Sequence, residues 1–114
     1  MNKFICVGNI TKDPATNDAG SMAYFSVAVK KDYKNKETGE YESDFISFIA
    51  FGNSIQYIMS YIRVGDIVCV EARVENGKKK EGGDYPKDSY IVQKINRIKK
   101  GKAHVEGIGG ADMF

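Results

Sequence analysis

Aromatic and basic side chains occur close together at several places in this chain. Tyr33 stands among lysines in one polar segment, Tyr85 stands among lysines in another, and Phe45 and Phe51 belong to one apolar run. An aromatic ring can stack on any base and a lysine can neutralise a phosphate, so this mixture is typical of a surface that binds single-stranded nucleic acid. The candidate binding residues are Tyr33, Phe45, Phe51, Tyr85, Lys31, Lys34, Lys36, Lys78, Lys79, Lys80 and Lys87.

The same residues also have a plainer interpretation. Phe45 and Phe51 could belong to the hydrophobic core, and the lysines could only keep the loops soluble. Among the other aromatic residues, Tyr24, Tyr41 and Tyr90 are weaker stacking candidates, whereas Tyr57, Tyr61, Phe25 and Phe48 are expected to pack. Their positions on strands and loops must decide between stacking and packing.

No group of residues has the spacing of a catalytic or metal site. His104 is the only histidine, and Cys6 and Cys69 lie far apart within apolar runs, where reduced thiols pack as small hydrophobic side chains. The sequence contains no nucleophile elbow, phosphate-binding glycine loop or dinucleotide fingerprint. We therefore expect a protein that is not an enzyme and that uses no metal and no cofactor.

Five segments have the alternation and the residue types of β-strands, and these strands must position the candidate residues. They are 3–10, 22–30, 44–51, 66–74 and 89–98. Asn53 or Ser54 can cap a helix of apolar residues at helical spacing, and Gly65 would end it. Long basic loops, 31–43 and 76–87, follow the second and fourth strands. This order predicts an all-β fold, a five-stranded OB-fold barrel with one short helix between strands three and four.

The third predicted strand carries apolar residues on both faces. Phe45, Ile49 and Phe51 alternate onto one face, and Ile46, Phe48 and Ala50 alternate onto the other. On the second strand, Phe25, Val27 and Val29 share one face. One face of the third strand is expected to pack against the core. The apolar residues on the opposite face must then contact something else, and bases could provide this contact.

Length and composition fit one domain in residues 1–100. The chain has 114 residues, of which 42% are hydrophobic and 28% are charged, and its net charge of +2 is too small for a polycation. Residues 101–114 contain four glycines and few apolar anchors, which predicts a flexible C-terminal tail. No apolar stretch approaches the roughly 20 residues that span a bilayer, and no signal peptide is recognisable, so we expect a cytoplasmic protein with no membrane contact.

Residues 1–100 resemble the bacterial and bacteriophage single-stranded DNA-binding proteins, the SSB family. The resemblance rests on NKFICVGNITKDP at 2–14, AFGN at 50–53 and YIRVGD at 61–66. It implies an OB barrel, usually a homotetramer, that coats and protects single-stranded DNA with little sequence preference during DNA replication, recombination and repair. Tyr33 matches the family's stacking aromatic after strand two, and Phe45 and Phe51 match the two on strand three. Tyr85 has no clean match.

The C-terminus departs from the family pattern. Family members end in an acidic run with a terminal hydrophobic residue, which recruits replication and recombination proteins. Asp112, Met113 and Phe114 stand at this place, but Asp112 is the only acid among the last five residues, which puts such recruitment in doubt. So short a tail resembles a bacteriophage-encoded version, which would act in the cytoplasm of a bacterial host.

Two other functions stay open at this point. Stacking and phosphate contacts do not separate DNA from RNA unless the 2′-hydroxyl is sensed, so the barrel could be an RNA-binding module. Alternatively, Phe45, Ile49 and Phe51 could lie against a protein, which would make the barrel a protein-interaction subunit of a replisome. The edge of the first strand, residues 3–10, could pair with a second copy, although composition cannot count subunits.

Overall fold

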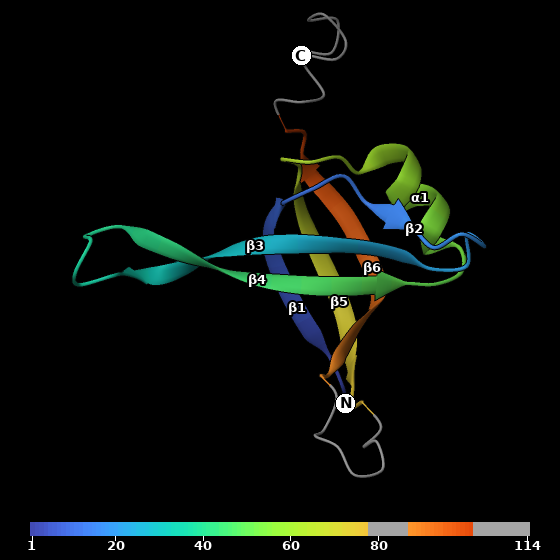
Figure 1. Cartoon of the computed structure of the whole chain (residues 1–114), viewed down its shortest axis with the longest axis horizontal. Helices are drawn as coiled ribbons and strands as arrows, with labels where there is room; N and C mark the ends of the chain where they lie inside the picture. Colours follow the sequence, from blue (N-terminus) through green and yellow to red (C-terminus); the bar gives the residue numbers. More distant parts are fainter. Residues whose placement is uncertain (78–86, 102–114) are drawn as a thin grey trace, which may run out of the picture.

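The computed structural model of this chain describes residues 1–77 and 87–101. Its elements are β1 (Phe4–Ile10), β2 (Ala15–Thr16), β3 (Ala23–Lys34), β4 (Tyr41–Ala50), α1 (Ser54–Tyr61), β5 (Ile67–Glu75) and β6 (Ser89–Lys99). The strands form one sheet in the order β1-β5-β6-β4-β3-β2, and an additional pairing of β1 with β3 closes it into a barrel (Figure 1). The five strands and the helix of the predicted OB barrel are confirmed, in the predicted order along the chain.

The two-residue strand β2 is an addition that the sequence does not predict. It follows Pro14 and pairs through Ala15 and Thr16 with the start of β3. Two residues are too few to show an alternation of apolar and polar side chains, so this strand has no periodic signal. The pairing holds the segment after β1 beside β3, at the end of the barrel near α1 (Figure 1).

The barrel closes where β1 meets β3 over two residue pairs. Asn9 faces Ala28, and Ile10 faces Val27. Gly8 precedes this seam, and a Cβ added there would collide with the backbone oxygen of Ala28 and would lie 2.7 Å from Val27 Cγ1. A residue without a side chain is therefore needed for β1 to approach β3 this closely.

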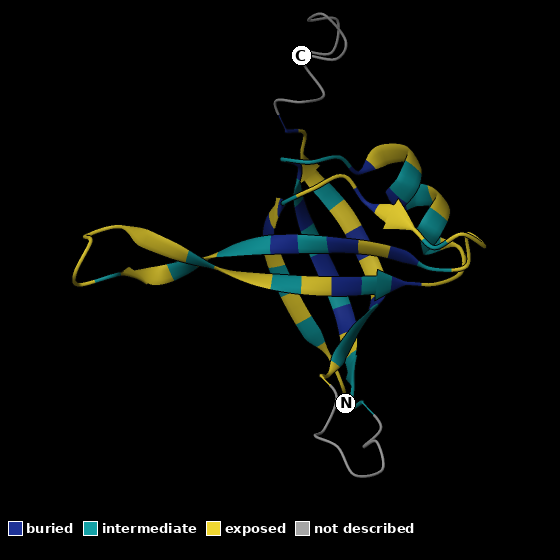
Figure 2. Cartoon of the chain, in the orientation of Figure 1, coloured by how far each residue is buried: buried dark blue, intermediate teal, exposed yellow. Residues whose placement is uncertain are grey.

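Aromatic rings fill the centre of the barrel. The rings of Phe25 and Phe48 stack with their centroids 5.3 Å apart, and Phe4 packs against Tyr90 with centroids 4.9 Å apart. The inward faces are those that the alternation predicts, because Phe25, Val27, Phe48 and Ala50 are all buried. Figure 2 shows buried residues alternating with more exposed ones along β3 and β4 within the barrel. The binary pattern of the sequence therefore identifies the core side of both strands correctly.

The helix is shorter than the sequence predicts. It ends at Tyr61, and Ile62 is already extended with φ −93° and ψ 128°. Gly65, with φ +87°, lies in the turn that follows and does not end the helix. Asn53 occupies the N-cap position, as the sequence predicts, but its side chain makes no capping hydrogen bond. The side chain of Ile62 is fully buried, so the chain leaves the helix as it enters the core.

Asp66 organises the turn between α1 and β5, and it is fully buried. Its Oδ2 accepts a hydrogen bond from the backbone N–H of Arg63 at 2.9 Å, and its Oδ1 accepts one from the N–H of Gly101 at 2.7 Å. The guanidinium of Arg97 lies 3.8 Å from Oδ2. One carboxylate therefore joins the end of the helix to β6 and to the segment after it.

Cys6 and Cys69 are free thiols on the neighbouring strands β1 and β5, and both are half-buried. Burial, and to a lesser degree the nearby Cys69, raises the pKa of the Cys6 thiol above its usual value, so its thiolate is disfavoured. Within residues 1–77 and 87–101, no group of three or more His, Cys, Asp and Glu side chains could hold a metal ion. In the same residues, no helix is long and apolar enough to cross a membrane.

Candidate nucleic-acid interface

The strands β3 and β4 continue past the barrel as a two-stranded arm. The sequence predicts a loop over 31–43, but β3 extends to Lys34 and β4 begins at Tyr41, so both ends of this segment belong to strands. The pairing is regular up to Lys30 and Ser43, and it is then shifted by extra residues in β3 before Lys34 meets Tyr41. The arm projects far from the barrel and is largely exposed (Figures 1 and 2). It has no core side, so its residues show no apolar alternation that would reveal a strand.

Asn35 shapes the turn at the end of the arm. Its side-chain Oδ1 accepts hydrogen bonds from the backbone N–H groups of Glu37, at 2.8 Å, and Thr38, at 3.2 Å. Gly39 completes the turn with φ +73°, a conformation that favours glycine. The turn covers residues 36–38, within the segment that the sequence predicts as a loop, and it places Lys36 at the exposed tip.

Phe45 and Phe51 lie on the outer face of the barrel. Phe45 is 69% exposed, and Phe51, which directly follows β4, is 47% exposed. Phe45 faces Ala28 across the sheet, and Ile49 between the two phenylalanines faces Tyr24. Large apolar rings on this side do not belong to the core, so the packing interpretation of Phe45 and Phe51 is wrong. Their exposure leaves them free to stack on a ligand.

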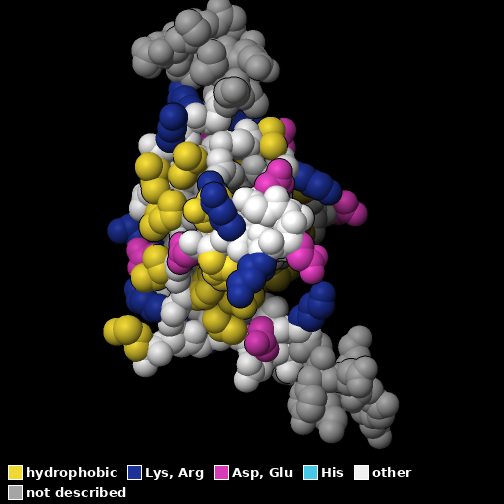
Figure 3. All heavy atoms as spheres, turned by 90° about the vertical axis from the view of Figure 1, so that its left-hand side faces the viewer, with side chains coloured by type: hydrophobic (Ala, Val, Ile, Leu, Met, Phe, Trp, Pro, Cys, Tyr) yellow, Lys and Arg dark blue, Asp and Glu magenta, His cyan; other side chains and the backbone are white. Residues whose placement is uncertain are grey.

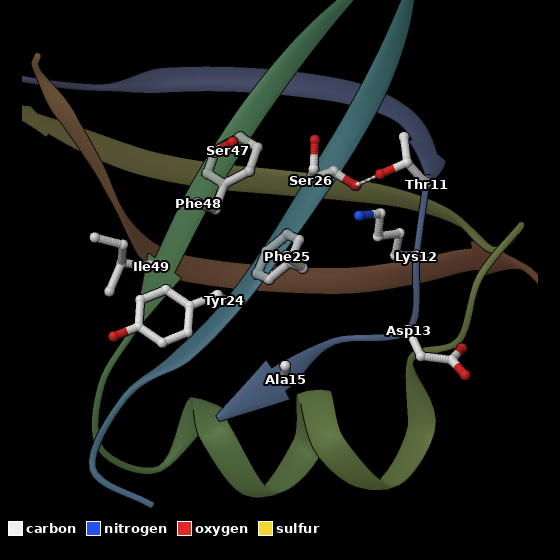
Figure 4. A pocket seen from close by; sticks show the side chains of 10 residues that line it. All are labelled: Thr11, Lys12, Asp13, Ala15, Tyr24, Phe25, Ser26, Ser47, Phe48 and Ile49. Atoms are coloured by element: carbon white, nitrogen blue, oxygen red, sulfur yellow. Dashed lines mark hydrogen bonds between the residues drawn. The ribbon is translucent and has the colours of Figure 1, made fainter. Parts of the chain in front are cut away.

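A hollow of about 580 Å³ adjoins this face (Figure 4). Its floor includes the facing pair Tyr24 and Ile49, and the segment from Thr11 to Ala15 forms the opposite wall. The hydroxyl of Thr11 donates a hydrogen bond to the backbone oxygen of Ser26 at 3.3 Å, which fixes the wall to β3. The exposed Lys12 lies at the rim, so the hollow combines an apolar floor with a cation.

The arm places its two tyrosines on opposite sides. The ammonium of Lys31 lies 3.8 Å from the carboxylate of Asp44 and 5.8 Å from the centroid of the Tyr33 ring. Asp44 directly precedes Phe45 in β4, so their side chains point to opposite faces. Tyr33 therefore lies on the side of Asp44, away from Phe45. The structure does not bring the three predicted stacking residues onto one surface, although Tyr33 is 66% exposed.

Tyr41 lies on the same side of β4 as Phe45, although the sequence ranks it as a weaker candidate. Its ring is 46% exposed. The ammonium groups of Lys30 and Lys34 lie 4.5 Å and 5.6 Å from its centroid. Every second residue from Phe51 back through Phe45 lies on the outer side, and this alternation also places Tyr41 there. It does not identify Tyr41 from the sequence, because that residue falls in a segment predicted as a loop.

The predicted lysines differ in how exposed they are. Lys31 is half-buried in its ion pair with Asp44, whereas Lys34, Lys36 and Lys87 are exposed. Seen from the tip of the arm, basic side chains lie at several places with acidic ones between them, so this side is mixed in charge (Figure 3). The remaining predicted site residues lie outside the described part of the chain: Lys78, Lys79, Lys80, Tyr85, Asp112, Met113 and Phe114.

This architecture defines an OB-type barrel, whose second and third strands and flanking loops are the usual surface for oligonucleotides. The second and third strands of that fold correspond here to β3 and β4, because β2 is an additional strand. Two solved structures share the fold. A small single-stranded DNA-binding protein from Streptomyces coelicolor has a TM-score of 0.60 and 23% identity, covering 85% of this chain and 94% of that one. The mitochondrial single-stranded DNA-binding protein Rim1 from S. cerevisiae has a TM-score of 0.66 and 22% identity, covering 87% and 96%.

The sequence comparison gives the family directly. Residues 1–98 match the single-strand binding protein family, and this chain belongs to it. A single-stranded DNA-binding protein of Clostridium perfringens is 30% identical over 116 residues, which cover 96% of this chain and 74% of that protein. A single-stranded DNA-binding protein 1 of Staphylococcus aureus is 33% identical over 87 residues, which cover 72% of this chain and 55% of that protein. The family resemblance predicted from 2–14, 50–53 and 61–66 is thus confirmed.

Proposed function

We propose that this protein binds single-stranded DNA without sequence preference through the outer face of β3 and β4. The observation that carries this proposal is the exposure of Phe45 and Phe51 on one side of a barrel whose opposite side is a filled core. Large apolar rings that share one exposed face are a sign of a surface that binds a ligand or a partner. The relatives in Clostridium and Staphylococcus bear the name single-stranded DNA-binding protein, which supports this ligand.

The mechanism is stacking combined with charge neutralisation. Bases stack on the exposed rings, each stack contributing about 1–3 kcal/mol, while lysines of the arm and of the second basic loop contact phosphates. A protein that binds one strand of a duplex favours the open form by mass action, so neither ATP nor a cofactor is required. Coating and protection of single strands in DNA replication, recombination and repair, and a bacteriophage origin, stay predictions from the resemblance.

One observation bears on the alternatives. The arm carries the ring of Tyr41 beside Lys30 and Lys34, and cations next to a ring favour a polyanion over the apolar patch that a protein partner would cover. The preference for DNA over RNA has no geometric support, because stacking and phosphate contacts serve both. RNA binding is therefore the second candidate function.

A fluorescence-anisotropy titration tests the proposal. Labelled oligo-dT, oligo-U and a duplex of equal length are each titrated with the protein over a range of salt concentrations. We expect oligo-dT to bind orders of magnitude more tightly than the duplex, with log affinity falling by about 0.7 per phosphate contact for each tenfold rise in salt. Tighter binding of oligo-U would favour the RNA module, and no binding of any strand would favour the protein-interaction subunit.

We also propose that the protein is a homo-oligomer that assembles through β1. Among the described strands, residues 4–8 of β1 pair only with β5, so their second edge is open. Ile5 and Val7 are 58% and 50% exposed on the outward face beside this edge. An open edge with apolar side chains is suited to pairing with a second copy. A tetramer, which the resemblance implies, would need a further contact.

Glutamate at both Ile5 and Val7 should lower the oligomeric state. Charges on an apolar contact between copies are desolvated without partners, which costs several kcal/mol. Light scattering coupled to gel filtration would show the wild type as a multiple of 12.7 kDa and the double variant at a smaller multiple. Glutamate at the exposed Gln93 of β6 is the matched control and should leave the mass unchanged. An unchanged mass in the double variant would place the interface elsewhere.

Recruitment of replication or recombination proteins by Asp112, Met113 and Phe114 stays a prediction. These residues lie outside the described part of the chain. The relatives in Clostridium and Staphylococcus extend beyond the matched region, so this chain spans 74% and 55% of their lengths. Binding of partners through the C-terminus therefore depends on the tail sequence alone.

A further inference from the structure

Tyr41, Lys30 and Lys34 form a cluster on the arm, which we call the arm cluster. We propose that the arm cluster is an additional nucleotide-binding site, in which Tyr41 stacks on a base while Lys30 and Lys34 contact the flanking phosphates. This inference rests on the proposed function and extends it beyond the barrel. The residues that the resemblance matches to stacking positions, Tyr33, Phe45 and Phe51, do not include Tyr41.

The first argument is the composition of the cluster. The ammonium groups of Lys30 and Lys34 lie 4.5 Å and 5.6 Å from the same ring centroid. One aromatic ring with two cations beside it presents a stacking surface and two phosphate-binding groups within the reach of one nucleotide unit. A cation on an exposed ring is held more weakly than a stacked base, so an incoming nucleotide can displace the ammonium groups from the ring onto its phosphates.

The second argument is the availability of the charges. Lys31 is engaged with Asp44 at 3.8 Å, and this contact offsets part of its charge. Among the salt bridges between described residues, none involves Lys30 or Lys34. Both lysines are exposed, and the contact that the structure shows for each of them is with an uncharged ring. Their positive charge is therefore available to a polyanion.

The third argument is continuity with the barrel face. Tyr41 and Phe45 belong to one strand and lie on the same side of it, separated by four residues or about 14 Å. Ser43 lies between them on that side and presents no bulk that would divide the surface. A single strand that crosses Phe51 and Phe45 therefore meets Tyr41 if it continues along the arm.

The test compares Tyr41→Ala with two matched variants. Tyr41→Phe keeps the ring, and Ser43→Ala removes a neighbouring hydroxyl from the same side of β4. Each protein is titrated with oligo-dT of increasing length, from about 4 to about 16 nucleotides, the range of OB-fold site sizes. Circular dichroism and thermal melting establish that every variant folds as the wild type does.

We expect the loss of affinity in Tyr41→Ala to depend on oligonucleotide length. The shortest strands that bind are held by Phe45 and Phe51 and should be unaffected, whereas strands long enough to reach the arm should bind about 5- to 150-fold more weakly. Tyr41→Phe and Ser43→Ala should match the wild type at every length. The double variant Lys30→Ala, Lys34→Ala should lower the salt slope by about 0.7 for each phosphate that is no longer neutralised, again only with the longer strands.

Three outcomes would overturn the inference. Equal affinity of wild type and Tyr41→Ala at all lengths would exclude stacking on Tyr41. An equal loss at every length, including the shortest, would show that Tyr41 acts through the structure of the barrel face. Absence of binding by the wild type would overturn the proposed function and this inference together, whereas the first two outcomes leave the proposed function intact.

Discussion

Alanine at both Phe45 and Phe51 is expected to weaken single-stranded DNA binding by about 2–6 kcal/mol, from about thirtyfold to more than ten-thousandfold. Each ring contributes one stack of about 1–3 kcal/mol, and the two phenylalanines are separated by enough chain to act on different bases. Both side chains are exposed in the absence of ligand, so their removal leaves the core unchanged. Anisotropy titration of oligo-dT measures the affinity, and thermal melting measures the fold.

Two control variants make this result specific. Ser47→Ala changes the same face between the two rings and should bind like the wild type. Phe48→Ala removes a buried ring from the opposite face and should destabilise the barrel by about 3–5 kcal/mol. If the wild type binds single strands and the double variant binds them equally well, bases do not stack on this face. The exposed rings would then be better explained by a protein partner.

Replacement of Asp66 by alanine is expected to lower the free energy of unfolding by about 3–5 kcal/mol. The carboxylate is fully buried and accepts hydrogen bonds from the backbone of Arg63 and Gly101, while Arg97 lies 3.8 Å away. Its removal leaves donors without their acceptor and a guanidinium without its counterion. A domain of this size has about 5–15 kcal/mol of stability, so the variant approaches the limit of folding. Urea denaturation followed by circular dichroism measures the loss.

Asp66→Asn removes the negative charge of the side chain and keeps its shape. The amide oxygen can still accept one backbone hydrogen bond, but the negative charge opposite Arg97 is removed. We expect a destabilisation between those of wild type and Asp66→Ala. Glu71→Ala serves as the control, because its ion pair with Lys3 is partly exposed and should contribute about 0.2–1 kcal/mol. Equal stability of Asp66→Ala and the wild type would mean that water replaces the carboxylate in this turn.

The sequence predicts those parts of the fold whose side chains alternate between core and solvent. Phe25 and Val27 on β3, and Phe48 on β4, show their inward direction in the pattern alone, and the alternation separates Phe45 from Phe48, although the sequence leaves packing of Phe45 as an open alternative. These positions are predictable because one buried face fixes the register of a strand.

The features that the sequence does not predict depend on long-range contacts or on a shift in pairing. Asp66 looks like an ordinary charged residue at the start of a predicted strand, because its partner Gly101 comes from the far end of the domain. The pairing of Lys34 with Tyr41 depends on the extra residues in β3 between Lys30 and Lys34, which no periodicity reveals. The paired arm itself has no buried face, so local pattern cannot distinguish it from a loop.

The arm differs from the barrel in what holds it rigid. Phe45 and Phe51 are mounted on a closed sheet with a packed core, whereas Tyr41 stands on a two-stranded ribbon, which is marginally stable when isolated. A ligand would therefore meet a preorganised anchor first and an adaptable extension second, and the entropic cost of ordering would fall mainly on the arm. If the arm binds DNA as proposed, dissociation would begin at the arm while Phe45 and Phe51 still hold the strand, so the strand would be released in stages.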